Sequence, residues 1–433
     1  MKRGSTFLFV AMSQLACGVA HVDLGSSDPA EESEFLFAMG ASATCAVGSD
    51  GILRCYGVGT DGRFGVPPST FTETCAGEPC VAAKAIRIGQ TPTSSVTLGD
   101  SFLCATLGGD TRCAGGNSFG MLGRGQHDRD AHTNFVAVDG RHALSKLVAG
   151  RGHACGLSSS GGVWCWGIGV HGQLGRDPNT LGDCGLPANV EEATRLAVSP
   201  TDILRCSEVP ALVPGLTGIT DLRAGPFATC AYSAPSGWRC FGRNVSGSLG
   251  VGTSHTGVFT PTALTVAGTM DVALGPTHGC LVDREGFVQC FGRAELGQLG
   301  IGTTAPDTCE GSPCALAPVM VRGLGPARRV AVGDAHSCVL LHDGSVSCFG
   351  SDSHGQIGDG DTTSDDCGGK RCSLAPRSVR SYVGIFKQIS AHGDATCATN
   401  GYDGLFCWGD GTRGELGQDV PQILSTPTRV PIP

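Results

Sequence analysis

The chain reads GRGHACGLSSSGGVWCWGIGVHGQLG from Gly150 to Gly175, and this stretch decides the fold because it recurs along the sequence. Another copy, GPTHGCLVDREGFVQCFGRAELGQLG, begins at Gly275, and a further copy, GDAHSCVLLHDGSVSCFGSDSHGQIG, begins at Gly333. The shared template is Gly-x-x-His-x-Cys, a turn that contains glycine, Cys-aromatic-Gly and Gly-x-Leu-Gly. In seven copies the second cysteine precedes the closing glycine by ten residues: Cys55 and Gly65, Cys113 and Gly123, Cys165 and Gly175, Cys240 and Gly250, Cys290 and Gly300, Cys348 and Gly358, and Cys407 and Gly417. A fixed repeat of this kind indicates a repeat architecture.

Each copy of the template predicts one small antiparallel sheet. Turn residues such as Asp343 and Gly344 lie midway between the two cysteines of a copy, which is typical of a β-hairpin. Cys45 and Cys397, the first cysteines of the first and last copies, are six repeats apart, so the average period is about 59 residues. Seven sheets of this size in a ring make a propeller. We therefore predict an all-β, seven-bladed β-propeller.

The two ends of the repeat region predict how the ring closes. Several copies continue after Gly-x-Leu-Gly into a strand that begins with proline: Pro210–Val213, Pro261–Leu264, Pro318–Val321 and Pro376–Val379. No such strand precedes the first hairpin, whereas the chain finishes with a similar segment, Pro427–Ile432. We predict that the C-terminal strand pairs with the first blade and closes the ring, because this pairing removes two exposed sheet edges.

The composition agrees with a folded repeat protein and disfavours several other classes. The 433 residues include 68 glycines, which argue against a mainly helical protein because an interior Gly costs about 1 kcal/mol relative to Ala. With 40% hydrophobic and 16% charged residues, the chain is not disordered as a whole. The formal net charge is −9 and no Lys/Arg run occurs, so we expect no nucleic-acid partner.

The N-terminus predicts export. Lys2 and Arg3 form a positive region, an apolar stretch covers 7–12, and small residues follow. Two cleavage sites compete: cleavage after Ala20 would release a soluble protein, whereas a lipoprotein-like site would make Cys17 a lipidated N-terminus. An ordinary buried N-terminal segment is the alternative. The predicted organisation is a signal peptide at 1–20, a linker at 21–34 and a propeller at 35–433, located outside the cell or lipid-anchored in the cell envelope.

The remaining 22 cysteines fall into pairs, which predicts a disulfide framework in an exported protein. Seven pairs belong to the template: Cys45/Cys55, Cys104/Cys113, Cys155/Cys165, Cys230/Cys240, Cys280/Cys290, Cys338/Cys348 and Cys397/Cys407. Four pairs lie between the copies: Cys75/Cys80, Cys184/Cys206, Cys309/Cys314 and Cys367/Cys372. Zinc sites usually have shorter gaps than the recurring pair, and reduced buried thiols are the other alternative.

The repeated polar and aromatic residues are interpreted as structural. His153, His278 and His336 occupy one template position in blades that are not three neighbours, so we expect hydrogen-bonded core histidines rather than metal ligands. The aromatic residues after the second cysteine are expected to pack between blades rather than to bind sugar. We find no phosphate loop, nucleophile motif or sialidase-type box, and we expect no cofactor and no enzymatic activity. The acidic run 359–366 hints at calcium, but the twelfth position of an EF-hand loop would be Lys370 rather than Glu.

Gly-x-x-His-x-Cys, Cys-Trp-Gly and Gly-Gln-Leu-Gly at these offsets resemble the repeat of the regulator of chromosome condensation (RCC1) family. The resemblance covers 35–433 and implies a seven-bladed propeller. The well-known eukaryotic members promote nucleotide exchange on a small GTPase, whereas secreted bacterial relatives include a β-lactamase inhibitor that binds through a propeller face. The chain resembles the secreted bacterial kind. It departs from the template where the histidine is replaced, at Ala43, Phe102, Ala228 and Ala395, and where the aromatic residue is replaced, at Ala114.

The loops after Gly-x-Leu-Gly predict the binding surface, because such insertions emerge on one side of a propeller. The longest runs from Arg176 to Val209, contains Cys184 and Cys206, and is expected to hold a short helix near 190–198. Candidate binding residues are Arg176, Asp177, Asn189, Glu191, Glu192 and Arg195. Protection against proteases is the alternative role for its disulfide. We predict a monomeric, non-catalytic module that binds a protein partner and touches membranes only through a lipid anchor. The alternatives are a nucleotide-exchange regulator of a small GTPase and a hydrolase that uses the central channel.

Overall fold

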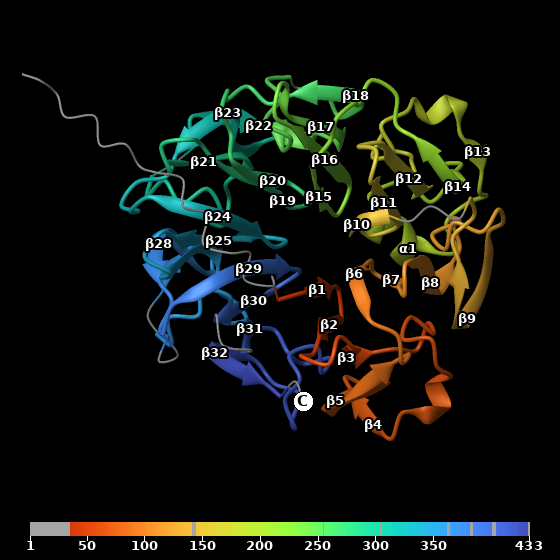
Figure 1. Ribbon diagram of the computed structural model, residues 1–433. Helices are drawn as coiled ribbons and strands as arrows, with labels where there is room; N and C mark the ends of the chain where they lie inside the picture. Colours follow the sequence, from red (N-terminus) through yellow and green to blue (C-terminus); the bar gives the residue numbers. More distant parts are fainter. Residues whose placement is uncertain are drawn as a thin grey trace, which may run out of the picture. The chain divides into compact units, whose positions relative to one another are not determined.

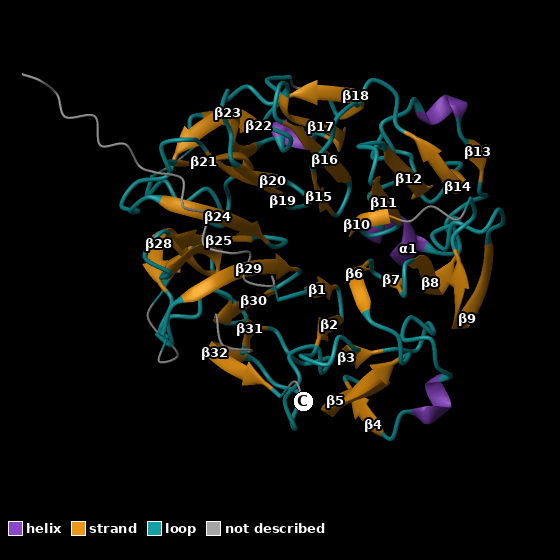
Figure 2. Cartoon of the chain, viewed as in Figure 1, coloured by secondary structure: helices purple, strands orange, loops and turns teal. Residues whose placement is uncertain are grey.

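The computed structural model describes residues 35–140, 144–253, 255–303, 305–361, 364–381, 384–400 and 404–431. The predicted signal peptide, the linker and Cys17 lie outside these residues. Within Phe35–Pro433, strands and loops make up nearly all of the described chain, and the helices are short (Figure 2). The prediction of an all-β protein is confirmed.

Seven antiparallel sheets of four or five strands form the blades of a ring (Figure 1). From the innermost strand outward, blade 1 contains β1 (Phe37–Gly40), β2 (Ala43–Val47), β3 (Leu53–Val58), β5 (Glu78–Ile88) and β4 (Glu73–Cys75). Blade 2 contains β6 (Thr93–Leu98), β7 (Phe102–Leu107), β8 (Asp110–Asn117) and β9 (Asp128–Ala137). Blade 3 contains β10 (Leu144–Ala149), β11 (His153–Ser158), β12 (Val163–Ile168), β14 (Arg205–Leu212) and β13 (Gly182–Asp183).

The remaining blades repeat this order. Blade 4 contains β15 (Asp221–Gly225), β16 (Ala228–Ser233), β17 (Gly237–Arg243) and β18 (Gly257–Ala263). Blade 5 contains β19 (Asp271–Leu274), β20 (His278–Val282), β21 (Val288–Arg293), β23 (Ser312–Met320) and β22 (Asp307–Cys309). Blade 6 contains β24 (Ala327–Val332), β25 (His336–Leu341), β26 (Val346–Ser351), β28 (Arg371–Ser378) and β27 (Asp365–Asp366). Blade 7 contains β29 (Phe386–His392), β30 (Ala395–Asn400), β31 (Leu405–Gly409) and β32 (Leu424–Val430).

The innermost strands establish the ring. Each of them contacts the innermost strand of the next blade, and β29 contacts β1, so the seven-bladed prediction is confirmed. The helices lie in loops between strands. They are the 3-10 helices η1 (Pro68–Thr70), η2 (Pro178–Thr180) and η3 (Val245–Gly247), and the α-helix α1 (Val190–Arg195).

Each copy of the template forms the two middle strands of its blade. In blade 3, Cys155 on β11 lies directly opposite Cys165 on β12, because the glycine-containing turn sits midway between them. The same register recurs in the other six hairpins. In all seven blades a disulfide joins the pair, and the two Cα atoms are 4.1 Å apart.

The other four cysteine pairs also form disulfides. Cys75–Cys80, Cys309–Cys314 and Cys367–Cys372 join or flank the strands of the outermost hairpins in blades 1, 5 and 6. Cys184–Cys206 joins the two ends of the long insertion in blade 3. The structure thus joins the 22 cysteines in the eleven pairs given by their spacing, and this number of disulfides indicates an oxidising environment.

The predicted closure of the ring is wrong. The C-terminal strand β32 pairs with β31 at the outer edge of blade 7, and blade 1 takes all its strands from its own repeat. The proline-led strands follow their hairpins rather than precede them, and the short strand β1 completes blade 1 on the inside. Side chains close the ring instead, because Tyr56 donates a hydrogen bond to the carbonyl of Pro431 and packs in one cluster with Val430.

Neighbouring blades are joined by an aromatic residue that lies against a glycine. The closing glycine of Gly-x-Leu-Gly has a φ between +63° and +74°, and the aromatic residue after the second cysteine of the next blade covers it. A Cβ atom on Gly358 would lie 2.6 Å from Trp408 Nε1. Trp408 also donates to the carbonyl of Gln356 at 2.9 Å. Glycine is therefore required both by the backbone conformation and by the close approach of the ring.

Blade 2 keeps this junction although it lacks the template aromatic residue. Ala114 occupies the position after the second cysteine. Phe135 on β9 takes the place of the missing ring, because a Cβ atom on Gly65 would lie 2.5 Å from its side chain. The departure at Ala114 is thus compensated within the same blade.

The repeated histidines also join neighbouring blades. His153 Nε2 lies 3.0 Å from the hydroxyl of Thr229 in the next blade, and this hydroxyl donates to the carbonyl of Gln173 at 3.1 Å. The hydroxyl proton is used for the carbonyl, so the imidazole donates from Nε2. Burial lowers the pKa of His153 to about 3, which agrees with a neutral ring.

The same contact links His278 to Ser337 at 3.0 Å and His336 to Thr396 at 2.7 Å. Burial lowers the pKa of His278 to about 3 and that of His336 to about 4. The junction between blades 7 and 1 differs, because Ala395 occupies the template position of the histidine. The buried Thr44 hydroxyl of blade 1 has no hydrogen-bond partner among the described residues.

Candidate functional site

The candidate site is the end of the propeller where the inner loops and the insertions gather. In each antiparallel blade, the loop between the first and second strands and the segment after the third strand leave at the same end. Hydrogen bonds connect these inner loops around the ring: Asp100 N–H donates to Arg151 O at 3.1 Å, and Arg151 N–H donates to Pro226 O at 3.0 Å. Asp334 N–H donates to Gly393 O at 2.8 Å in the same way. We call this end the loop end.

The long insertion of blade 3 covers part of the loop end. It leaves β12, passes through η2, β13 and α1, and returns into β14. The side chain of Asp177 caps η2 by accepting from Asn179 N–H at 2.9 Å. The helix α1 ends at Arg195 and is therefore shorter than the sequence predicts.

Local hydrogen bonds define α1, and two blades hold it in place. Asn189 Oδ1 accepts from Glu192 N–H at 2.8 Å and caps the helix, and the Glu192 carboxylate accepts from the N–H of Ala188, the residue before the cap. Arg195 Nη1 lies 3.3 Å from Asp100 Oδ2 in blade 2. The carbonyl of Arg195 accepts from Arg151 Nη1 in blade 3 at 3.0 Å. The insertion is thus a fixed part of the propeller.

The structure separates the six predicted binding residues into supporting and exposed positions. Arg176 is partly buried, and burial lowers its pKa. Asp177 and Asn189 cap helices, although both side chains remain accessible, and Glu192 and Arg195 are turned toward the propeller. Glu191 lies on the exposed side of α1.

Sequence reasoning missed the exposed apolar residues of the insertion. Val190 is 67% exposed, and Leu186 and Ile203 are each 50% exposed. The sequence does show that these three residues lie between Cys184 and Cys206, which indicates an ordered loop. It does not show which side of a short helix faces solvent, so their exposure could not be predicted.

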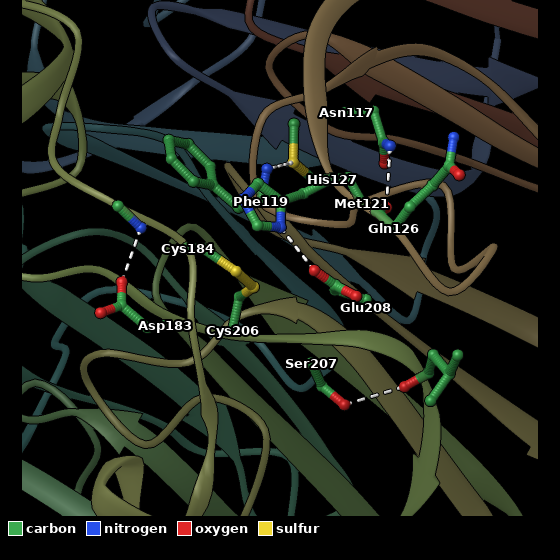
Figure 3. The surroundings of a disulfide bond; sticks show 12 residues. Asn117, Phe119, Met121, Gln126, His127, Asp183, Cys184, Cys206, Ser207 and Glu208 are labelled. Carbon is green, nitrogen blue, oxygen red and sulfur yellow. Dashed lines mark hydrogen bonds and ion pairs between the residues drawn. A yellow bond between two sulfur atoms is a disulfide. The ribbon is translucent and has the colours of Figure 1, made fainter.

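The disulfide of the insertion lies beside a histidine from blade 2 (Figure 3). His127, Cys184 and Cys206 place possible ligand atoms within 4.8 Å of one another. His127 Nδ1 is paired with the Glu208 carboxylate (Figure 3). A metal ion would need a free thiolate as its ligand, whereas the two sulfurs are bonded to each other. The His127–Glu208 pair instead connects blade 2 to the insertion.

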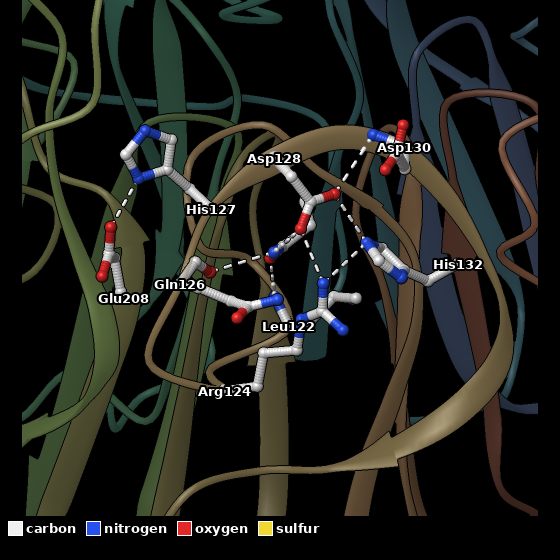
Figure 4. A network of polar contacts seen from close by, with 9 residues as sticks. Leu122, Arg124, Gln126, His127, Asp128, Asp130, His132 and Glu208 are labelled. Carbon is white, nitrogen blue, oxygen red and sulfur yellow. Dashed lines mark hydrogen bonds and ion pairs between the residues drawn. The ribbon is translucent and has the colours of Figure 1, made fainter.

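A polar network on the neighbouring strand supports the same region (Figure 4). Asp128 contacts His132 Nε2 at 2.7 Å and Arg124 Nη2 at 2.6 Å, and it also accepts from Asn117. Burial opposes ionisation, but these hydrogen bonds lower the pKa of Asp128 to about 2. Arg129 extends from this strand and donates to the carbonyl of Leu186 at 2.8 Å.

Charged residues meet near the centre of the loop end. Arg151 of blade 3 forms an ion pair with Asp334 of blade 6, with Nη2 and Oδ2 3.0 Å apart. The guanidinium groups of Arg151 and Arg243 lie 5.2 Å and 5.5 Å from the ring centre of Phe227. Burial and the neighbouring Arg293 lower the pKa of Arg243. The inner loops are therefore tied together by charge as well as by backbone hydrogen bonds.

The acidic run 359–366 is used in local contacts, as far as it is described. Arg377 Nη1 lies 3.3 Å from Asp359 Oδ2 and 3.8 Å from Asp361 Oδ2. Asp365 Oδ2 accepts from Leu374 N–H at 2.9 Å. Residues 362 and 363 lie outside the described chain. The hypothesis of a calcium site stays a prediction.

The ring of seven blades, each built on one copy of a cysteine-hairpin template, defines the class as a repeat-built β-propeller. Two sequence models of protein families match the chain, and both describe the regulator of chromosome condensation (RCC1) repeat. One matches residues 145–173 and 327–356, and the other matches residues 285–340. The chain therefore contains RCC1-like repeats, which these matches place at 145–173 and 285–356.

Two solved structures share the fold. Human WBSCR16 has a TM-score of 0.68 and 19% sequence identity, with 87% of this chain and 94% of that chain covered. Prp20p from Saccharomyces cerevisiae has a TM-score of 0.64 and 18% identity, with 82% of this chain and 80% of that chain covered. At these identities the likeness concerns the fold alone.

Two curated relatives match short segments. The E3 ubiquitin-protein ligase MYCBP2 of Danio rerio is 39% identical over 108 residues, which is 24% of this chain and 2% of that protein. The X-linked retinitis pigmentosa GTPase regulator homolog of Caenorhabditis elegans is 35% identical over 88 residues, which is 20% of this chain and 6% of that protein. The matches thus span only a small fraction of these relatives. In the described part of this chain, no helix has the length and apolar character needed to cross a membrane.

Proposed function

We propose that this protein is a non-catalytic binding module that recognises a protein partner through the insertion Arg176–Val209 at the loop end. The observation that carries the proposal is the combination of a fixed attachment and an exposed apolar surface. Arg195 and the Cys184–Cys206 disulfide hold the insertion on blades 2 and 3. An ordered loop loses little conformational entropy when a partner binds.

The distribution of exposed apolar side chains supports the insertion as the contact surface. Three of the twelve large hydrophobic residues that are exposed in the described chain lie within its 34 residues: Leu186, Val190 and Ile203. Exposed large hydrophobic residues are therefore more frequent in the insertion than in the described chain as a whole. Glu191 adds a carboxylate to this surface, and a polar rim around apolar contacts is typical of protein interfaces.

We also propose that the protein is exported. The eleven disulfides fit an oxidising compartment, and the N-terminal segment has the composition of a signal peptide. The non-reduced intact mass of the protein from its native cells tests this directly. Cleavage before Cys17 with added acyl mass identifies a lipid-anchored protein, and cleavage after Ala20 identifies a soluble exported protein. A full-length, fully reduced chain contradicts export.

The structural relatives support a protein partner in general terms. The structure report on Prp20p describes its binding properties toward Gsp1p and histones, so this fold can present a protein-binding surface. A nucleotide-exchange activity on a small GTPase is the alternative, and the disulfides argue against it because such GTPases work in a reducing compartment.

Affinity capture with the immobilised, oxidised full chain tests the proposed surface. A matched variant replaces 186–203 with a Gly/Ser loop of equal length and keeps the Cys184–Cys206 disulfide. A second control carries Phe287→Ala on an exposed hairpin turn. The proposal expects one extracellular or envelope protein to bind the wild type and the Phe287→Ala control and to be lost with the loop variant. Retention by the loop variant contradicts the proposed surface, and capture of a small GTPase supports the alternative.

A further inference from the structure

The end of the propeller opposite the loop end carries exposed apolar side chains on blade 5. The hairpin turns between the second and third strands of the blades lie here, and we call it the turn end. Met270 precedes β19 and is 61% exposed, Phe287 lies in the turn between β20 and β21 and is 56% exposed, and Met320 ends β23 and is 44% exposed. Three of the twelve large hydrophobic residues that are exposed in the described chain therefore lie at one end of one blade.

Backbone pairing brings these three residues close to one another. Met270 N–H donates to Val282 O at 2.7 Å, at the end of the strand that leads into the turn. Met320 lies opposite Gln289, which is two residues after Phe287. The three apolar residues therefore lie around the same hairpin turn, and a contact that covered them would be favourable.

Exposed arginines lie beside these apolar residues. They are Arg284, Arg322 and Arg328. A Cβ atom on Gly268 would lie 2.8 Å from Arg284 Nε, so this side chain covers the segment that leads to Met270. Ala327 N–H donates to Gly286 O in the turn at 2.9 Å, which places the next residue, Arg328, beside the turn.

The acidic groups of this region are partly withdrawn from the surface. Asp271 is buried and pairs with Arg329, and Asp283 is buried and accepts from Glu285 N–H at 3.1 Å inside the turn. The exposed carboxylates are Glu285 and, on the turn of blade 6, Asp343. With Arg329 included, four exposed arginines accompany two exposed carboxylates, so this surface has a positive excess in a chain whose formal net charge is −9.

The N-terminal segment of the chain is connected to the turn end. The strand β1 (Phe37–Gly40) runs from the turn end to the loop end, and Val47 N–H donates to Leu36 O at 2.9 Å beside the hairpin turn of blade 1. The residues before Phe35 include the predicted signal segment and Cys17. A lipid anchor at Cys17 would therefore be attached through the turn end.

We propose that the turn end of blade 5 contacts the surface of a membrane that contains anionic lipids. Met270, Phe287 and Met320 enter the boundary between headgroups and acyl chains, and the arginines pair with lipid phosphate groups. The negative charge at the loop end has little influence on this contact. A six-residue strand is about 20 Å long, whereas charges are screened beyond about 8 Å at physiological salt.

This contact goes beyond the lipid anchor that the sequence predicts, because the propeller itself touches the membrane. It rests on the proposed export but not on the protein partner, and it leaves the insertion at the opposite end accessible. The intact mass from native cells tests export, whereas vesicle binding is measured on purified protein. Failure of one is therefore distinguished from failure of the other.

Flotation with lipid vesicles tests the proposal on the purified, oxidised chain that begins after Ala20, which has neither signal segment nor acyl group. The propeller at 35–433 is a compact unit within this chain. The vesicles contain phosphatidylcholine alone or an equal mixture with phosphatidylglycerol. At about 0.15 M salt we expect at least tenfold stronger binding to the anionic vesicles. Absence of binding to the anionic vesicles, or equal binding to both kinds, overturns the proposal.

Two variants locate the contact. Phe287→Gln removes an exposed apolar side chain and Arg328→Gln removes an exposed charge, and each is expected to weaken binding to the anionic vesicles at least threefold. The matched controls at the loop end are Val190→Gln and Arg413→Gln, because both residues are exposed there and should leave binding unchanged. Unchanged binding in either turn-end variant, or an equal loss in the controls, contradicts the assigned surface.

Discussion

At the junction between blades 6 and 7, Trp408, His336 and Gln356 occupy template positions, whereas the insertion of blade 3 lies outside the template. These side chains are fully buried. Trp408 donates to the backbone carbonyl of Gln356, and His336 Nε2 contacts the hydroxyl of Thr396. The insertion leaves Val190 and Glu191 exposed. The comparison indicates that repeated residues stabilise the ring and that unrepeated residues provide recognition.

The largest effect is expected from the junction ring. Trp408→Ala removes a fully buried indole and its hydrogen bond, and we expect a loss of about 3–5 kcal/mol in the free energy of unfolding. Guanidinium denaturation of the oxidised protein measures this loss. Phe287→Ala is the matched control, because that aromatic side chain is exposed and its removal should cost under about 0.5 kcal/mol. Equal losses in the two variants would contradict a special role for the junction.

Glu415 gives a pH-dependent test of the junction between blades 7 and 1. Glutamine occupies the equivalent position in blades 3, 5 and 6, and burial raises the pKa of Glu415 from 4.5 to about 7. The unfolded chain ionises first, so wild-type stability falls between about pH 4.5 and 7. We expect Glu415→Gln to raise stability by about 2–3 kcal/mol at pH 8 and to leave it unchanged at pH 4.

The control for this substitution is Glu191→Gln, because Glu191 is exposed. It should show no such pH dependence. A Glu415→Gln variant whose advantage is the same at pH 4 and pH 8 would show that ionisation of the carboxylate is not the cause.

Two threonines allow a junction with the histidine contact to be compared with a junction that lacks it. Thr396→Val leaves His336 Nε2 without its partner, and we expect a loss of about 1–3 kcal/mol. Thr44→Val removes a buried hydroxyl that has no partner among the described residues, so stability should stay unchanged or rise by about 1 kcal/mol. Denaturation midpoints at pH 7.5 distinguish the two variants, and equal losses would mean that the histidine contact does not matter.

The smallest effect on stability is expected in the insertion. Val190→Asp changes an exposed side chain on α1, and the free energy of unfolding should remain within about 0.5 kcal/mol of the wild type. Denaturation under the same conditions measures this. A loss comparable to that of Trp408→Ala would show that the insertion stabilises the ring, and the contrast between the two regions would disappear.

The sequence predicts the parts of this fold that depend on local spacing. Cys155 and Cys165 face each other because a turn lies between them, and this follows from residues close in sequence. The closure was predicted incorrectly because the choice between β31 and blade 1 as the partner of β32 depends on distant segments. The short strand β1 also gave no clear periodic signal.

The candidate site was only partly predictable for the same reason. Glu191 and Arg195 both lie on one short helix, and composition does not distinguish them. Their roles differ because Asp100, which is 95 residues away in the sequence, holds Arg195.

The affinity of the captured partner for three forms of the chain tests the central claim most directly. Surface plasmon resonance would compare the wild type, Val190→Asp and Thr396→Val, all oxidised and below their unfolding range. The account predicts at least a tenfold loss of affinity for Val190→Asp and an unchanged affinity for Thr396→Val. Unchanged affinity for Val190→Asp together with a loss for Thr396→Val would contradict the assignment of recognition to the insertion.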